Sequence, residues 1–253
     1  MRHEYLDPRN KFKIFAHRGL VYDSEKTVRD ENTILAFEVA LSAGADYLEL
    51  DVQCSRDGVA VVFHDETLDR VSTERGRISD KSWSELQQVK LNHGGSIPSI
   101  EQILTAFAET KINIDVKAAQ AIPDLSRAIQ AHNAQSRVLL TSFSEKRRTK
   151  AVAAITGAAT SPSASMLLRI WFSYRIGIGL RYLLKKVNAL QIPVSYGVLR
   201  LDSPKFITSV QRHDVEVIYW TINDPKEALR LQSIGANGIV TDRTDLMVEL
   251  KKP

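Results

Sequence analysis

The sequence contains one cysteine, Cys54, among its 253 residues. No disulfide within the chain is therefore available, and we expect a reducing compartment, the cytoplasm. Long apolar runs are also missing. A membrane-spanning helix needs about 18 or more apolar residues in succession, and the sequence has no such stretch. The first ten residues hold no apolar run, so we expect no secretory signal.

Charge of one sign is not strongly in excess. The formal net charge is +4 and the sequence pI is about 9.1, which is too weakly basic to indicate a nucleic-acid partner. This balance favours a small anionic substrate or a weak membrane contact. With 43% hydrophobic and 25% charged residues, the composition is that of an ordinary soluble globular protein.

Two carboxylates stand out in the strand-like run of residues 47–52. Side chains alternate across a strand, so Glu49 and Asp51 lie on one face. The opposite face is apolar and is formed by Leu48, Leu50 and Val52. Two buried like charges need compensation, and a divalent cation with oxygen ligands supplies it. An exposed strand end or pairing with basic side chains remains an equally good interpretation of this run alone.

Strand-like and helix-like segments alternate along the chain. Strands are expected at residues 13–19, 47–52, 111–117, 137–143, 215–223 and 237–242, and helices at residues 32–45, 99–109, 122–134, 144–156, 225–236 and 244–252. This rhythm predicts an α/β fold with a parallel sheet, and the chain length is that of a (β/α)8 TIM barrel. We assign residues 1–253 to a single domain. The second strand is expected to continue into a hairpin around residues 56–58. Residues 66–97, which come after this hairpin, are expected to form a small insertion.

The segment 166–187 is apolar with basic residues at Arg169, Arg175, Arg181, Lys185 and Lys186. One interpretation is a barrel helix, or two short helices, whose basic side chains face water. The other is an amphipathic element at the surface of an anionic membrane. The sequence leaves both open.

Polar residues recur at the carboxyl ends of the expected strands, where barrel enzymes carry their active sites. These residues are His17, Arg18, Glu49, Asp51, His64, Asp115, Lys117, Trp220 and Asp242. Strands with a purely structural role would not require polar residues repeatedly at the same end.

Ordered motifs carry a family resemblance over about residues 13–248. They are HRG (17–19), ENT (31–33), GADYLELDV (44–52), a run ending in FHD (57–65), IPSIEQIL (97–104), TSF, YWTIND and GIVTDR. This set resembles the glycerophosphodiester phosphodiesterase family, which is related to the phosphatidylinositol-specific phospholipases C. The resemblance implies a (β/α)8 barrel and hydrolysis of glycerophosphodiesters to sn-glycerol 3-phosphate and an alcohol. It also implies one divalent metal ion, Mg²⁺ or Ca²⁺.

Matching positions carry the implied roles. The resemblance implies metal ligands at Glu49, Asp51 and Asp115, a general acid/base pair at His17 and His64, phosphate-facing cations at Arg18 and Lys117, an aromatic wall at Trp220, and a polar edge at Glu31 and Asn32. Asp115 stands where the family usually has Glu, which shortens this ligand by one methylene group.

Alternatives remain at three levels. Lys117 could have the structural role of neutralising Asp115, and Trp220 could be a residue of the apolar core. Within the same chemistry, a lysophospholipase D-like activity on lysophospholipids is the alternative. A barrel that binds phosphate or lipid without turnover is the alternative from a different class.

Overall fold

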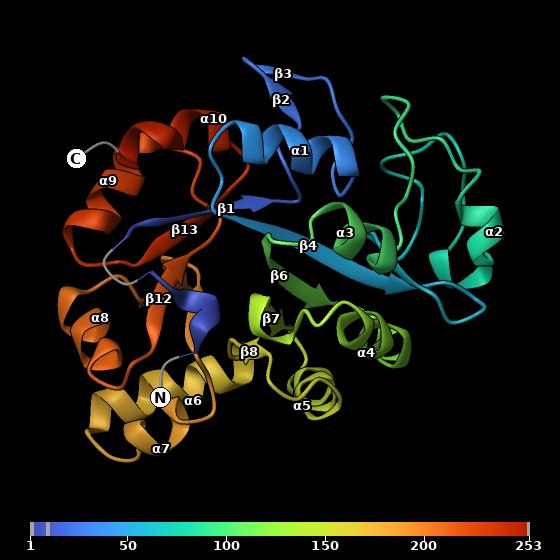
Figure 1. The fold of residues 1–253 in the computed structure, drawn as a ribbon. Helices are drawn as coiled ribbons and strands as arrows, with labels where there is room; N and C mark the ends of the chain where they lie inside the picture. The colour runs from blue at the N-terminus through green and yellow to red at the C-terminus, as the bar shows by residue number, and fades with distance from the viewer. Residues whose placement is uncertain (1–2, 9–10, 252–253) are drawn as a thin grey trace.

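Parallel β-strands alternate with α-helices in the computed structural model, which describes residues 3–8 and 11–251. The barrel strands are β1 (Lys13–His17), β4 (Tyr47–Cys54), β6 (Lys111–Val116), β7 (Val138–Thr141), β8 (Ala159–Thr160), β9 (Ala189–Ile192), β12 (Glu216–Tyr219) and β13 (Gly238–Thr241). Their order is β8-β7-β6-β4-β1-β13-β12-β9. Between the two outermost strands, the Asn188 N–H donates to the Thr160 carbonyl at 2.8 Å. The predicted (β/α)8 barrel is confirmed (Figure 1).

Helices surround the barrel (Figure 1). They are α1 (Ile34–Ser42), α3 (Ile100–Ala106), α4 (Ile122–Ala131), α5 (Glu145–Ala154), α6 (Ala164–Ile176), α7 (Leu180–Leu184), α8 (Pro204–Gln211), α9 (Pro225–Ser233) and α10 (Thr244–Met247). Several begin at a hydroxyl cap, because the side chains of Thr33, Ser99, Ser144, Ser163 and Ser203 each accept a backbone N–H of the first turn. Such caps satisfy donors that have no partner within the helix.

The two faces of each strand have different neighbours. The side chains of Leu48, Leu50 and Val52 belong to an apolar cluster that also contains Phe37 of α1 and Leu125 of α4. Outward-facing strand residues thus form the layer between sheet and helices. The inward positions of β4 are left for Tyr47, Glu49 and Asp51, since side chains alternate along a strand.

An apolar layer closes the amino-terminal end of the barrel interior. Tyr5 and Leu6, in a 3-10 helix (Glu4–Leu6), are fully buried against inward residues of several strands. The Tyr47 ring stacks on Phe15 with centroids 4.2 Å apart, and the Tyr47 hydroxyl donates to the Tyr5 carbonyl at 2.9 Å. With one end filled by aromatic rings, polar side chains gather at the opposite, carboxyl-terminal end.

The segment 66–97 lies outside the barrel. It follows β5 (Ala60–Val62), which pairs antiparallel with β4 as the predicted hairpin requires. It contains a 3-10 helix (Ile78–Asp80) and α2 (Trp83–Leu86), and its side chains Leu68, Ile78, Leu86 and Leu91 form an apolar cluster with Val61 and Phe63. The assignment of the whole chain to one domain stays a prediction.

Some elements differ from the sequence-based expectation. The segment 166–187 forms two helices, α6 and α7, as one interpretation predicts. Strands β8 and β9, helix α8 and the hairpins β2–β3 (Tyr22–Asp23, Lys26–Thr27) and β10–β11 (Ser195–Tyr196, Leu199–Arg200) were not expected. The expected final helix is α10 followed by a 3-10 helix (Val248–Lys251), and residue 252 lies outside the described residues. None of the described helices has the length and apolarity that crossing a bilayer requires.

Candidate active site

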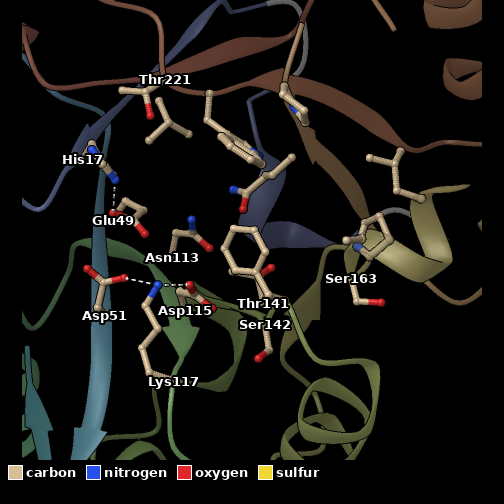
Figure 2. Close-up of a pocket in the computed structure, with 18 of the residues that line it drawn as sticks. His17, Glu49, Asp51, Asn113, Asp115, Lys117, Thr141, Ser142, Ser163 and Thr221 are labelled. Atoms are coloured by element: carbon tan, nitrogen blue, oxygen red, sulfur yellow. Dashed lines mark ion pairs between the residues drawn. The ribbon is translucent and has the colours of Figure 1, made fainter. Parts of the chain in front are cut away.

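A cavity of about 240 Å³ opens at the carboxyl ends of the barrel strands. Figure 2 shows its lining residues converging from several strands and the loops that follow them. Eight of the ten residues predicted from the sequence line it: His17, Arg18, Glu49, Asp51, His64, Asp115, Lys117 and Trp220. The other two, Glu31 and Asn32, hydrogen-bond to lining residues at the edge. The structure therefore brings all ten together.

The carboxylates of Glu49 and Asp51 lie deep in this cavity, 7% and 2% exposed. Burial, followed by the charge of Asp51, raises the pKa of Glu49 to about 8. Burial alone would also raise the pKa of Asp51, but Lys117 and Arg18 outweigh it and lower that pKa below its usual value. Asp51 is therefore already compensated, whereas Glu49 is held where its negative charge is costly.

Lys117 lies between two carboxylates, as Figure 2 shows. Its Nζ is 3.0 Å from Asp51 Oδ1 and 2.6 Å from Asp115 Oδ2. Asp51 and Asp115 are directly opposite each other in the parallel β4–β6 pair. Burial opposes the ammonium charge, but the two carboxylates outweigh it and raise the pKa of Lys117. The predicted neutralisation of Asp115 is thus present, and the same ammonium group reaches the cavity.

The HRG and ENT motifs meet at Asp51. The Arg18 guanidinium lies 3.1 Å from Asp51 Oδ2 through Nε and donates to Glu31 Oε1 at 3.2 Å. The Asn32 amide donates to Asp51 Oδ2 at 3.0 Å. Arg18 and Asn32 both have left-handed backbones, with φ of 56° and 57°. Non-glycine residues in this region are uncommon and concentrate at functional sites.

The glycine of the HRG motif is required by close packing. A Cβ atom at Gly19 would lie 2.7 Å from Ala36 atoms of α1. The backbone φ of +86° at this position also disfavours a side chain. Gly19 thus lets α1 approach strand β1 closely and holds Arg18 at the cavity.

His17 is oriented by a carboxylate that the predicted site residues do not include. Its Nδ1 lies 2.6 Å from Asp242 Oδ1, and Asn223 donates to Asp242 Oδ2 at 2.7 Å. Burial lowers the pKa of His17, but the Asp242 hydrogen bond and the charge of Glu49 raise it above its usual value overall. Its other nitrogen, Nε2, is 3.9 Å from Glu49 Oε2. The arrangement leaves Nε2 for chemistry in the cavity.

His64 has a similar carboxylate partner. Its Nδ1 lies 2.6 Å from Asp65 Oδ1, and Arg70 Nε donates to Asp65 Oδ2 at 2.6 Å. The same guanidinium donates twice to Glu31, at 2.9 and 2.7 Å. Arg70 belongs to the segment 66–97 and therefore joins this insertion to both the FHD and the ENT motifs. Sequence reasoning missed it, because one arginine in a polar loop gives no signal of its own.

One side of the cavity is apolar. The side chains of Phe143, Leu167, Pro193, Tyr196 and Trp220 line it. Phe143 meets Trp220 edge to face, with ring centroids 6.0 Å apart, and Lys117 Nζ lies 5.5 Å from the Phe143 ring centroid. Trp220 is partly buried against the interior apolar cluster and also lines the cavity, so its role at the substrate stays a prediction.

The oxygen donors suit a hard divalent cation. In the described part of the chain, no group of three or more His, Cys, Asp or Glu side chains is already arranged around a common metal position. However, Asp115 Oδ1 and Asn113 Oδ1 are buried without a hydrogen-bond partner among the described residues, and ionisation of Glu49 beside them is costly without a cation. Carboxylate and amide oxygens are the donors that Mg²⁺ and Ca²⁺ prefer. The residues present therefore fit the ion that the resemblance implies.

A family model describes almost all of this chain. The model of the Glycerophosphoryl diester phosphodiesterase family matches residues 17–246. The chain belongs to this family. Its membership agrees with the resemblance found in the ordered motifs.

Individual relatives agree with this assignment. The chain is 33% identical over 220 residues to a probable glycerophosphodiester phosphodiesterase 2 of Mycobacterium tuberculosis, covering 85% of this chain and 83% of the relative. A solved glycerophosphodiester phosphodiesterase of Agrobacterium tumefaciens superposes with a TM-score of 0.78 at 23% identity, covering 94% of this chain and 98% of that one. An Oleispira antarctica phosphodiesterase in complex with the product sn-glycerol-3-phosphate superposes with a TM-score of 0.76 at 22% identity, covering 94% and 96%. At these identities the two solved structures support the fold.

Proposed function

We propose that this protein hydrolyses small glycerophosphodiesters to sn-glycerol 3-phosphate and an alcohol in a metal-dependent reaction. The observation that carries the proposal is the pair of histidines at one cavity, each with its Nδ1 on a carboxylate. The same cavity is lined by the cations Arg18 and Lys117. Family membership and the named product of the Oleispira relative support the same reaction.

The two histidines act as general acid and base. Asp242 and Asp65 hold Nδ1 of His17 and His64, so Nε2 of each ring exchanges the proton. One ring accepts the proton of the attacking oxygen as the new P–O bond forms. The other donates a proton to the leaving alkoxide as the old P–O bond breaks. The attacking oxygen belongs either to water or to the substrate's glycerol hydroxyl, which would form a cyclic phosphate.

The remaining predicted residues bind and orient. Arg18 and Lys117 face the anionic phosphate, while Glu31 and Asn32 hold Arg18 and Asp51 in place through their hydrogen bonds. Trp220 forms an apolar wall for the substrate's carbon skeleton. The guanidinium and ammonium groups stabilise charge on the non-bridging oxygens most when water is excluded.

The carboxylates of Glu49, Asp51 and Asp115 are the proposed holders of one Mg²⁺ or Ca²⁺ ion. When bound, such an ion supplies Lewis-acid stabilisation of the phosphate oxygens. Placing its positive charge beside Glu49 removes the penalty that now raises the pKa of this residue. Lys117 contacts Asp51 and Asp115, so it would share these two carboxylates with the ion. Its ammonium group would then be available to the substrate phosphate as well.

Release of glycerol 3-phosphate from a panel of glycerophosphodiesters tests the proposal, with coupled enzymatic detection. We expect EDTA to abolish release and Mg²⁺ or Ca²⁺ to restore it. Full turnover after exhaustive chelation, with no metal by elemental analysis, would show that the metal role is wrong. Binding of the diesters without any product would instead identify a non-catalytic barrel.

A lysophospholipid substrate is the second candidate. The apolar side of the cavity, with Phe143, Leu167 and Tyr196, favours a substrate with an acyl chain. A human relative named lysophospholipase D GDPD1 is 25% identical, covering 95% of this chain and 86% of its own length. The test compares lysophosphatidylcholine with glycerophosphocholine in wild type and in Leu167→Ser. Loss confined to the lysolipid would support this candidate, and equal loss of both activities would contradict it.

A further inference from the structure

A long part of the sequence carries basic residues without any acidic ones. Residues 146–201 contain ten Lys and Arg residues and no Asp or Glu. Because the whole chain has a net charge of +4, the remaining residues together carry −6. The positive charge of this protein is therefore concentrated in one part of the fold, which includes α6 and α7.

Five of these cations are exposed on α6, α7 and the residues next to α7: Arg169, Arg175, Arg181, Lys185 and Lys186. Among the described residues, none of the five forms an ion pair with a carboxylate. Basic residues elsewhere in the chain do form such pairs, among them Lys11, Arg56, Arg77, Arg127 and Arg230. Two of them lie over aromatic rings instead. Arg175 is 5.5 Å from the Trp171 ring centroid and Lys186 is 4.5 Å from that of Tyr182. Unneutralised charge on this scale attracts an anionic surface.

Large apolar side chains are exposed among these cations. Phe172, Ile176, Ile178 and Tyr182 are 57, 66, 71 and 66% exposed. Phe172 and Ile176 are four residues apart in α6 and therefore lie on one face. Ile178 stands between Gly177 and Gly179, whose φ values of 74° and 79° turn the chain from α6 into α7. This turn leaves an isoleucine at the corner of the two helices.

A hollow lies beside the apolar residues. It is bordered by the end of α6, by α7 and by the end of α8, and Arg181, Lys185 and His213 are among its lining residues. Tyr182 lines the same hollow. In Figure 1, α6 and α7 lie at the outer edge of the molecule, away from the insertion that contains α2. An anionic group has space and two cations in the hollow, next to side chains that suit a hydrocarbon environment.

We propose that this face binds the surface of an anionic lipid bilayer. We call it the α6–α7 surface, and define it as Arg169, Phe172, Arg175, Ile176, Ile178, Arg181, Tyr182, Lys185 and Lys186. Aliphatic side chains insert at the boundary between headgroups and acyl chains while basic side chains meet anionic headgroups. A nucleic-acid partner would account for the cations but not for the exposed apolar side chains of Ile176 and Ile178. A second copy of this chain would bring five unpaired cations against five others.

Co-sedimentation with vesicles tests the proposal on the full-length wild-type protein. Vesicles of phosphatidylcholine alone are compared with vesicles containing about 30% phosphatidylserine, at about 50 mM and about 500 mM salt. We expect at least about tenfold stronger partitioning onto the phosphatidylserine vesicles at low salt, and release at high salt. Absence of binding to the anionic vesicles at low salt would overturn the proposal.

Matched variants locate the contact. Replacing Arg181, Lys185 and Lys186 together by Gln should lower partitioning onto the anionic vesicles at least about tenfold. The control removes the same charge elsewhere, at the exposed residues Lys26, Lys90 and Lys226, and should change partitioning less than about twofold. Equal loss in both triple variants would show that net charge, and not this surface, is responsible. Circular dichroism checks that all variants are folded.

Apolar variants separate the membrane from other partners. Ile176→Ser with Ile178→Ser should lower partitioning onto anionic vesicles at least about fivefold, whereas the control pair Leu229→Ser with Leu246→Ser, exposed on α9 and α10, should have little effect. Unchanged partitioning in the Ile176/Ile178 variant would overturn the insertion. Two further results would also overturn the proposal: tight oligonucleotide binding that this variant retains, or a dimer that it dissociates. None of these readouts depends on catalysis, so they stand or fall separately from the proposed hydrolysis.

Discussion

Replacing Glu49 by Gln should stabilise the metal-free protein while removing its activity. Glu49 is buried next to Asp51, and its pKa rises from 4.5 to about 8. In metal-free protein the native state therefore keeps a proton on Glu49 that the unfolded chain releases above pH 4.5. The unfolded state binds fewer protons in this window, so the free energy of unfolding falls as pH rises from 4.5 to about 8.

The magnitude follows from the same two values. Each pH unit is worth about 1.4 kcal/mol, so the full rise corresponds to about 5 kcal/mol as an upper bound. His17 and Arg18 are close enough to reorient toward an ionised Glu49, which reduces the effect. We therefore expect the free energy of unfolding of Glu49→Gln to exceed that of wild type by at least about 2 kcal/mol at pH 9, with little difference at pH 5. Gln has nearly the same shape and no titrating proton.

Urea unfolding of both proteins in EDTA, at pH values between 5 and 9, measures this difference. Glu38→Gln is the matched control, because Glu38 is an exposed residue of α1, and its profile should follow wild type. Adding Mg²⁺ or Ca²⁺ at pH 9 should raise the free energy of unfolding of wild type more than that of Glu49→Gln. Parallel pH profiles for wild type and Glu49→Gln in EDTA would refute the reasoning, because Glu49 would then carry no destabilising charge.

Three further predictions test the proposed roles. His17→Ala and His64→Ala should each lower kcat at least about 10²-fold in steady-state assays, and near-wild-type kcat would mark that histidine as structural. Asp115→Asn should raise the metal concentration for half-maximal activity at least about tenfold, or about 1.4 kcal/mol, while Asp115→Glu stays active; a wild-type titration curve for the Asn variant would exclude Asp115 as a ligand. Arg70→Gln should lower kcat about tenfold through loosened orientation of His64, with Arg70→Lys intermediate and Arg75→Gln, an exposed neighbour, unchanged; equal effects at both arginines would contradict a positioning role.

The barrel could be predicted because most of its strands carry a strong signal. Residues 111–116 alternate between polar and apolar, residues 138–141 form a short apolar run, and a helical pattern follows each; both are strands of the structure. Strand β8 has two residues, Ala159 and Thr160, and so short an apolar run gives no periodicity. Helix α8 was missed although Ser203 and Pro204 form a recognisable start, a hydroxyl cap followed by proline at the first position.

Polar residues at the strand ends explain why the predicted site residues converge, but two supporting residues, Asp242 and Arg70, were not among them. Asp242 was recognised as the polar end of the last strand. Its contact with His17 arises because barrel closure pairs β1 with β13, with Ala16 opposite Thr241. Closure places first and last strands side by side, so this pair was accessible to reasoning from the sequence. Arg70 was not, because its position depends on the path of an irregular loop.

The interior of the barrel explains why a destabilising site persists here. On two strands the inward residues change from aromatic to polar toward the carboxyl end, as Phe15 precedes His17 on β1 and Tyr47 precedes Glu49 and Asp51 on β4. The filled layer around Tyr5 and Tyr47 consists mainly of aromatic and aliphatic side chains, so their burial stabilises the fold. The polar layer above it contains carboxylates whose negative charges repel one another when no cation is bound. Because the two layers lie on the same strands, packing in the lower one fixes the spacing of the carboxylates in the upper one.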